Sequence, residues 1–367
     1  MIIDLILAGY ILTGIYGLIL FLFIIGILTL SRKRDAEIKP VSVIIAARNE
    51  EMRLPELIAA LAAQDYPAEK YEVIIIDDRS SDRTVQILKD NADEYSWLCY
   101  ASLTEENPAL VGKKGALASG IQMAEHEILA FTDADCLPGR KWLSEINSLM
   151  TPETDFLCGY SPLGGNSFIS RLKNLERSSI FAVIAGSFGI GWDLTSVARN
   201  QVYRKSRFEL IKGFSGIGEQ RSGDDDLLLQ KMSPVIRKRN FIFDPEAGVL
   251  SYDKQKIRDH IDLETRRASK WKLYPFPIKI LTLFILVYYL LLTAILVTAI
   301  SGIYPWITFI KLALIKAGSE FLLLFLFLFR VKQLRQLLMF PLAEIFYIPY
   351  FIYFGLKGTF GTYKWKK

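Results

Sequence analysis

Two aspartates one residue apart, Asp133 and Asp135, follow an apolar run in the segment "ILAFTDADCL" at residues 128–137. A charged side chain at the end of a buried strand costs free energy unless another group compensates it. Two carboxylates at this spacing can present oxygen ligands to Mg²⁺ or Mn²⁺, which keep further positions for phosphate oxygens. The pair therefore predicts a metal site that binds a diphosphate. A helix N-cap at Asp135 beside a solvated Asp133 would use the same residues.

A glycine-rich phosphate loop does not accompany these aspartates. The sequence has no GxGxxG or Walker A run, and "GFSGIGEQ" at residues 213–220 lacks the required spacing. A Rossmann dinucleotide site and a P-loop are therefore not predicted.

Acidic residues also follow two other apolar runs. Glu50 comes shortly after residues 41–47, and Asp77 and Asp78 end the segment "YEVIIIDD". Between residues 40 and 160 such runs alternate with helical periodicity, which predicts an α/β domain with a mostly parallel sheet. Because ligands of such sheets bind beyond the carboxyl ends of the strands, we expect these carboxylates to line one cleft.

The two ends of the chain have the composition of membrane-spanning helices. Residues 5–30 carry no charge, and residues 276–300 form a second long apolar run. Two further runs, near 306–329 and 337–356, are interrupted by charges or prolines, so we expect two to three C-terminal helices. "SRKR" after the first run places the N-terminus outside and the following domain in the cytoplasm. Four full spans would put the C-terminal "YKWKK" outside, against the same rule.

Charge distribution indicates a membrane partner. The formal net charge is only +5, and the basic clusters flank the apolar runs. They are typical of contacts with anionic lipid headgroups, and we expect no nucleic-acid partner. The predicted organisation is an anchor at 1–34, a catalytic domain at 35–272 and a membrane region at 273–367. Residues 167–189 are amphipathic, which fits either a helix at the membrane surface or packing against the core.

Seven segments in order resemble those of membrane-bound family 2 glycosyltransferases, and the resemblance covers roughly residues 40–272. In chain order they are "VSVIIAARNEE", "IIIDDRSSDRT", "GKKGAL", "FTDADC", "ARNQVYRKSRFELIKGF", "SGDDDLLLQ" and "RRASKW". The resemblance implies the GT-A fold, a nucleotide-sugar donor (a UDP-sugar first) and Mg²⁺ or Mn²⁺ as cofactor.

The resemblance also implies roles for residues on the donor side. Glu50 and Asp78, with Asp77 nearby, would bind the uracil and ribose of the donor, and Lys113 would lie near the nucleotide or diphosphate. Asp133 and Asp135 would hold the metal on the diphosphate, and Asp135 is the more direct ligand in this interpretation.

On the acceptor side, the resemblance places Asp224 at the general-base position, with Asp225 as the alternative one residue along. Gly223 stands where the family usually has Glu, and Lys270 stands where it usually has Arg. Arg267 and Lys270 would offer positive charge to the leaving diphosphate, and Trp271 would form a wall for the acceptor. Without the other segments, "RRASKW" would equally fit a basic and aromatic anchor at the membrane surface.

The sequence thus predicts an inverting, metal-dependent glycosyltransferase in a bacterial cytoplasmic membrane. It would transfer a sugar to a hydroxyl of a lipid or lipid-linked acceptor. A processive polysaccharide synthase is the alternative within the same chemistry, and a membrane scaffold without catalysis is the alternative of another class.

Overall fold

A seven-stranded sheet in the order β3-β2-β1-β4-β8-β6-β9 positions the predicted site. The structure is a computed structural model that describes residues 2–252 and 257–361. Its first half consists of four parallel strands: β1 (Val41–Ala47), β2 (Tyr71–Asp77), β3 (Leu98–Ser102) and β4 (Ile128–Phe131). β1 and β2 are buried along nearly their whole length, as their continuous β-branched runs require.

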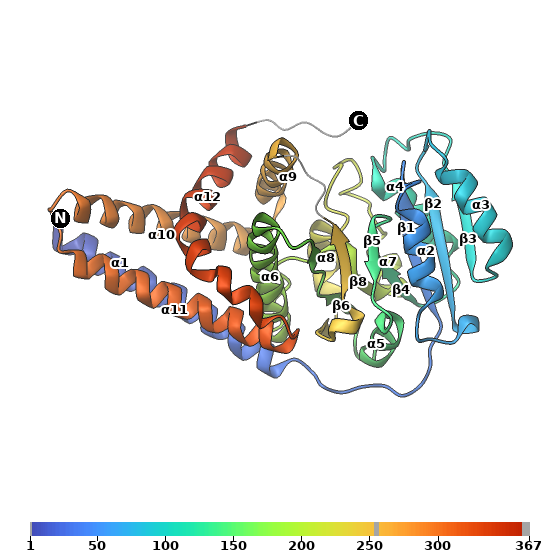
Figure 1. The fold of residues 1–367 in the computed structure, drawn as a ribbon, viewed down its shortest axis with the longest axis horizontal. Coiled ribbons are helices and arrows are strands. Elements are labelled where there is room, and N and C mark those ends of the chain that lie inside the picture. The colour runs from blue at the N-terminus through green and yellow to red at the C-terminus, as the bar shows by residue number, and fades with distance from the viewer. Residues whose placement is uncertain (1, 253–256, 362–367) are drawn as a thin grey trace.

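Helices cover both faces of these strands, as the burial of a parallel sheet requires (Figure 1). The covering helices are α2 (Leu54–Ala62), α3 (Thr84–Glu94), α4 (Lys113–Met123) and α5 (Trp142–Leu149). Apolar residues of α2, α3 and α5 share one core with Val41, Val43 and Ile45. Those of α4 share the other core with Ile44. Alternate residues of β1 therefore point into different layers.

One strand in the second half of the sheet runs opposite to all the others. β8 (Gln201–Arg204) is antiparallel to both neighbours, whereas β6 (Phe156–Gly159) and β9 (Arg239–Ile242) are parallel to each other. A small second sheet pairs β5 (Cys136–Pro138), β10 (Val249–Tyr252) and β7 (Leu163–Gly164). Short helices α7 (Lys205–Leu210), α8 (Asp226–Met232) and α9 (Ile257–Ser269) complete the domain. The mostly parallel α/β fold is confirmed.

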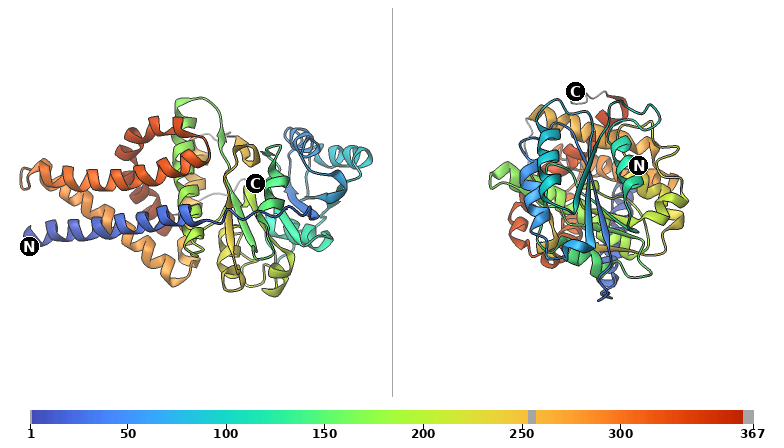
Figure 2. Two further views of the ribbon diagram at one scale, coloured as in Figure 1. Left: turned by 90° about the horizontal axis from the view of Figure 1, so that it is seen from below. Right: turned by 90° about the vertical axis from the view of Figure 1, so that its right-hand side faces the viewer.

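Four helices of the described chain are long and apolar enough to cross a membrane: α1 (Ile2–Thr29), α10 (Phe276–Ile300), α11 (Trp306–Arg330) and α12 (Phe340–Phe360). α1, α10 and α11 form a bundle that projects away from the sheet, and α12 runs across its base toward α9 (Figures 1 and 2). One N-terminal and three C-terminal apolar helices are thus present. The "YKWKK" segment lies outside the described residues.

Helix α6 (Phe168–Gly189) stands between the bundle and the sheet. A Cβ added to Gly26 of α1 would lie only 1.9 Å from the carbonyl oxygen of Gly186, and one added to Gly189 would lie 1.8 Å from that of Gly26. The two backbones therefore touch, which only glycine permits here. Phe181 and Ala185 are fully buried, so core packing holds for this part of the helix.

Candidate active site

The ends of β1 and β2 meet at one edge of the sheet, since Ala47 and Asp77 are register partners. The Asp77 carboxylate is buried and accepts hydrogen bonds from the Ser80 backbone amide. Asp78 forms an ion pair with Arg79 at 2.8 Å. Asp77 therefore shapes the turn after β2, while Asp78 lies at its charged rim.

The turns after these strands are joined by hydrogen bonds between Asn49 and two serines. The Asn49 amide donates to Ser80 Oγ at 2.9 Å, and Asn49 Oδ1 accepts from the Ser81 amide at 2.8 Å. Nearby, the Glu50 amide donates to Thr84 Oγ1 at 2.9 Å. Asn49 adopts a φ of +55°, a conformation that Asn tolerates better than most residues. These bonds hold Glu50 beside the Asp77–Asp78 turn.

Asp133 and Asp135 follow β4 and lie close enough to share a cation. One carboxylate oxygen of each and the Cys136 sulfur all lie within 4.8 Å of one another. Burial and the two carboxylates raise the pKa of the Cys136 thiol far above its ordinary value, so the sulfur stays protonated. The two carboxylates are thus the donors that fit, and hard oxygen ligands suit Mg²⁺ or Mn²⁺.

Lys113, at the start of α4, links the Asp133 segment to the acidic segment before α8. Its ammonium forms an ion pair with Asp133 and lies 3.7 Å from an Asp224 oxygen. Burial would lower the pKa of Lys113, but the two carboxylates outweigh it and raise this pKa above the ordinary value. Asp224 follows Asp133 by 91 positions in the chain and Lys113 by 111 positions. The fold therefore brings three residues that are distant in sequence into one charged centre.

The three consecutive aspartates differ in their surroundings. Burial, together with Asp225 and Asp133, raises the pKa of Asp224 despite Lys113. Burial also acts on Asp225, but Lys270 and backbone amides hold its pKa below the ordinary value. Asp226 is buried and its pKa is raised to about 6, by burial first and by Asp225 second. Asp225 is therefore the ionised helix cap, and Asp224 is the carboxylate with the greater proton affinity of these two.

Gly223 departs from the family pattern for a reason visible in the backbone. Its φ is +91°, and an added Cβ would lie 2.4 Å from Leu227 Cδ1. A Glu side chain at this position would require a different turn before α8.

The "RRASKW" segment lies beside the acidic segment, but its cations already have partners. Lys270 lies 2.5 Å from an Asp226 oxygen and 3.7 Å from an Asp225 oxygen. Arg267 pairs with Glu264 at 2.6 Å. Trp271 donates from Nε1 to Thr359 Oγ1 of α12 at 3.0 Å. The structure thus brings Lys270 to the acidic segment, whereas Trp271 contacts the C-terminal helix.

Three residues near this centre were not identified from sequence. The Lys114 ammonium donates to the Gln220 carbonyl and, at 2.8 Å, to the Ser222 carbonyl, so it fixes the loop that leads to Asp224. Tyr274 donates to Asp226 at 2.5 Å. The charge of Arg199 acts on Asp133, and its Nε is buried without a hydrogen-bond partner among the described residues. Only Lys114 had a local signal, as the second lysine of "GKKGAL".

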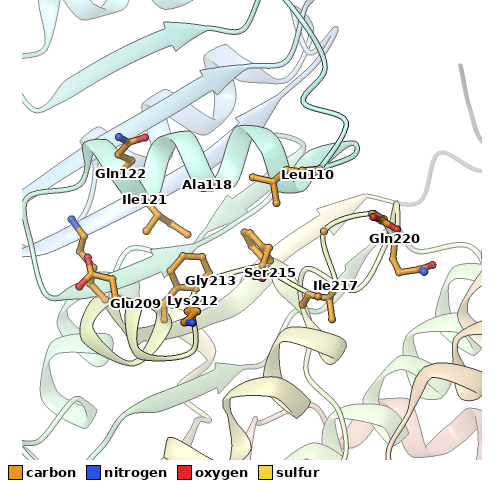
Figure 3. A pocket seen from close by; sticks show the side chains of 17 residues that line it. Leu110, Ala118, Ile121, Gln122, Glu209, Lys212, Gly213, Ser215, Ile217 and Gln220 are labelled. Carbon is orange, nitrogen blue, oxygen red and sulfur yellow. The ribbon is translucent and has the colours of Figure 1, made fainter.

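A pocket of about 850 Å³ lies on the other side of this loop, between α4, α7 and residues 212–220 (Figure 3). Ile121 and Gln122 of α4 face it from one side, and Lys212 and Ile217 face it from the other. None of the residues predicted to act in catalysis or binding lines it. We therefore assign the chemistry to the Lys113 centre and not to this pocket.

Comparison with known proteins matches residues 42–208 to the sequence model of glycosyl transferase family 2. This part of the chain, just under half of its 367 residues, is similar to a family 2 glycosyltransferase domain. A stretch of 95 residues is 43% identical to the beta-monoglucosyldiacylglycerol synthase of Trichormus variabilis, covering 26% of this chain and 20% of that protein. Glycosyltransferase AglE of Haloferax volcanii is 36% identical over 103 residues, which are 28% of this chain and 33% of that protein. The matches thus span only a fifth to a third of these relatives.

The likeness to one solved structure extends beyond residues 42–208. The mannosyltransferase PcManGT from Pyrobaculum calidifontis, in complex with GDP-Man and Mn²⁺, superposes with a TM-score of 0.56. The superposition covers 94% of this chain and 97% of that one, at 18% sequence identity. At this identity the likeness shows the fold alone, which is GT-A-like.

Proposed function

We propose that the protein is a membrane-bound, metal-dependent, inverting glycosyltransferase. It transfers a sugar from a nucleotide sugar, a UDP-sugar first, to a hydroxyl of a lipid or lipid-linked acceptor. The observation that carries this proposal is the position of Lys113 between Asp133 and Asp224. Lys113 joins Asp133, a carboxylate suited to binding the metal of a metal-bound diphosphate, to Asp224, a carboxylate suited to removing a proton from the acceptor.

On the donor side, we assign Glu50 and Asp78 to the base and ribose, with Asp77 as the residue that fixes their turn. Carboxylates can accept hydrogen bonds from the N–H and hydroxyl groups of a nucleoside. The GDP-Man and Mn²⁺ present in the PcManGT structure support a nucleotide-sugar donor and a divalent metal.

Around the diphosphate, we assign Asp133 and Asp135 as metal ligands. A bound Mg²⁺ or Mn²⁺ would neutralise the charge that develops on the leaving diphosphate. Arg199 is the further cation that we assign to this group, because its charge acts on Asp133 and its Nε has no hydrogen-bond partner among the described residues.

For the transfer itself, we assign Asp224 as the general base. It takes the proton of the acceptor hydroxyl while that oxygen forms a bond to the anomeric carbon. The bond from this carbon to the diphosphate oxygen breaks on the opposite face, which inverts the configuration. A raised pKa strengthens a carboxylate as a base, which supports Asp224 over Asp225.

The "RRASKW" segment receives a revised role. Lys270 is paired with Asp226, so we propose that it positions the acidic segment and does not meet the diphosphate directly. Arg267 stands one helical turn earlier and would add positive charge near the site, and Trp271 would brace the acceptor side through α12.

In the membrane, we propose that residues 1–34 anchor the chain, residues 35–272 form the catalytic domain and residues 273–367 form the membrane region. Arg32, Lys33 and Arg34 follow α1, which favours a catalytic domain in the cytoplasm of a bacterial cell. If α1, α10 and α11 cross the membrane and α12 lies across the base of the bundle without crossing, the C-terminal end of α12 is on the cytoplasmic side, as the catalytic domain is.

The test is release of UDP from a panel of UDP-sugars by the detergent-solubilised protein with membrane lipid extract. We expect one donor to be used, with activity that disappears in EDTA and returns with Mn²⁺ or Mg²⁺. Products with one sugar per lipid would support single transfer, whereas long chains would indicate a processive synthase. A folded protein that neither binds nor uses any nucleotide sugar would contradict the proposal and favour the scaffold alternative.

A further inference from the structure

A second, apolar cavity of about 860 Å³ lies between α6 and the C-terminal helices. Ile180 and Val183 of α6, Leu281 of α10, Leu323 of α11 and Phe351 of α12 line it. Its volume falls in the range of small-molecule sites, roughly 300–1,000 Å³. Four of the helices that line it, α1, α10, α11 and α12, are candidate membrane spans, so a hydrocarbon chain could enter it from the bilayer.

One end of this cavity reaches the acidic segment. Tyr274 lines the cavity and donates its hydroxyl hydrogen to Asp226 at 2.5 Å. Leu194 and Thr195, in the chain segment before β8, line the cavity together with Tyr274. A molecule with its chain in the cavity would therefore present its polar end toward the Asp224–Asp226 segment.

The charges of the cavity wall are mainly acidic. Among the described lining residues the carboxylates are Glu176, Glu320 and Glu344, while Lys173 is the lysine. A further lysine, Lys316, lies behind the wall, 2.8 Å from Glu320 and 2.9 Å from Glu344. Its side chain is only 2% exposed, and its single positive charge is shared between these two glutamates.

The wall thus suits one class of headgroup better than another. A phosphate would meet an excess of carboxylates, and like charges in a poorly solvated site cost free energy. A hydroxyl can donate to a carboxylate and accept from a tyrosine, and Tyr347 and Tyr350 line the cavity. Tyr16 lines it too, but its hydroxyl already donates to Glu320 at 2.6 Å.

We propose that this cavity binds the hydrocarbon part of the acceptor, and that the acceptor is a neutral lipid with a free hydroxyl and not a lipid phosphate. The inference rests on the proposed transferase function and specifies its acceptor. It assigns α1, α6, α10, α11 and α12 as walls of the acceptor site, with Glu320 and Glu344 as residues that select against an anionic lipid.

The test compares two probes with the same chains, dioleoylglycerol and dioleoyl phosphatidic acid, as competitors for radiolabelled dioleoylglycerol on the full-length protein in detergent. We expect dioleoylglycerol to bind at least about tenfold more tightly, which is about 1.4 kcal/mol. Glu344→Gln leaves the Lys316–Glu320 pair in place and should reduce the ratio of the affinity for dioleoylglycerol to the affinity for dioleoyl phosphatidic acid. Equal binding of the two probes to the wild type would overturn the choice of a neutral lipid.

A matched pair of variants tests the location. Ala343→Trp fills the cavity, whereas Ala294→Trp puts the same side chain on the exposed face of α10. Only the first should lose dioleoylglycerol binding, and equal binding by both variants would overturn the site. Binding of UDP-sugar is measured on the same samples. If the wild type binds UDP-sugar but not dioleoylglycerol, only this inference falls. If the wild type binds no UDP-sugar, the proposed function falls first.

Discussion

The donor edge and the acceptor cavity of this protein are held together by different kinds of contact. At the donor edge, carboxylates follow strands in continuous register, and each cation lies near its partner, as in the Arg79–Asp78 pair. The cavity is formed by helices far apart in the chain, and its buried charges are balanced across helices, as between Lys316 and Glu344. A rigid sheet therefore fixes the donor side, whereas the acceptor side depends on how helices pack against one another.

The strongest way to break the donor side alone is Asp135→Asn. The variant keeps the size of the side chain but removes a metal-ligand charge, so transfer should fall by about 10²–10³-fold or more. Transfer rates at saturating metal measure the effect. Asp93→Asn, on the exposed surface of α3, is the control and should retain full activity. Lipid binding should be unchanged in both, and an active Asp135→Asn would remove this residue from the metal site.

Lys113→Gln removes the cation that joins Asp133 on the donor side to Asp224 on the acceptor side. Without its charge, Asp133 and Asp224 lose their shared partner, and we expect the transfer rate to fall by about 10²-fold, the scale of a lost charge contact in the transition state. Lys113→Arg should recover part of the rate because it restores the charge. Exposed Lys89→Gln on α3 serves as the control. If Arg and Gln behave alike, the charge of Lys113 is not what joins the two segments.

The contact between α1 and α6 tests the packing that supports the cavity. Gly26→Ala places a methyl group against the Gly186 carbonyl, and overpacking of this kind costs about 1–3 kcal/mol. Thermal unfolding in detergent should show a lower Tm than the wild type. Gly14→Ala lies on the same helix with no atom of another segment within 4 Å of the added carbon, so it should leave Tm unchanged. Equal Tm values for the two variants would contradict the close approach.

The smallest expected effect concerns the pH dependence of stability at Glu176. Burial first, and Glu264 second, raise its pKa from 4.5 to about 7. Between these pH values the folded protein holds a proton that the unfolded chain releases, so this group destabilises the fold increasingly as pH rises through the window. Glu176→Gln should therefore flatten Tm between pH 4.5 and 7, while exposed Glu69→Gln should not. An unchanged pH profile would show that Glu176 ionises normally.

The sequence predicted the donor side well because its signals are local. Continuous β-branched runs indicate buried strands, so both strands could be predicted. β1 matches the predicted residues 41–47, and β2 ends one residue earlier than predicted. Asp133 and Asp135 stand out because charge follows a buried run directly.

Contacts between distant segments could not be predicted in this way. Hydrophobic periodicity does not indicate which helix Gly26 contacts. It also does not indicate that Lys270 forms an ion pair with Asp226. The cavity is formed by side chains from residues 16 to 351, so it exists only once α6 packs between the bundle and the sheet. The same holds for Arg199, whose position beside Asp133 depends on the pairing of β4 with β8.

The central claim is that the Lys113 centre transfers sugar to lipid with Asp224 as the base. The most direct test is incorporation of radiolabelled sugar from its UDP-sugar into extractable lipid, by the wild type and by Asp224→Asn, with UDP-sugar binding measured on both. We predict labelled lipid with the wild type, and at least about 10²-fold less with Asp224→Asn at unchanged donor binding. Equal labelling by the two proteins would contradict the assignment of Asp224, and donor binding without any labelled lipid would contradict transfer to lipid.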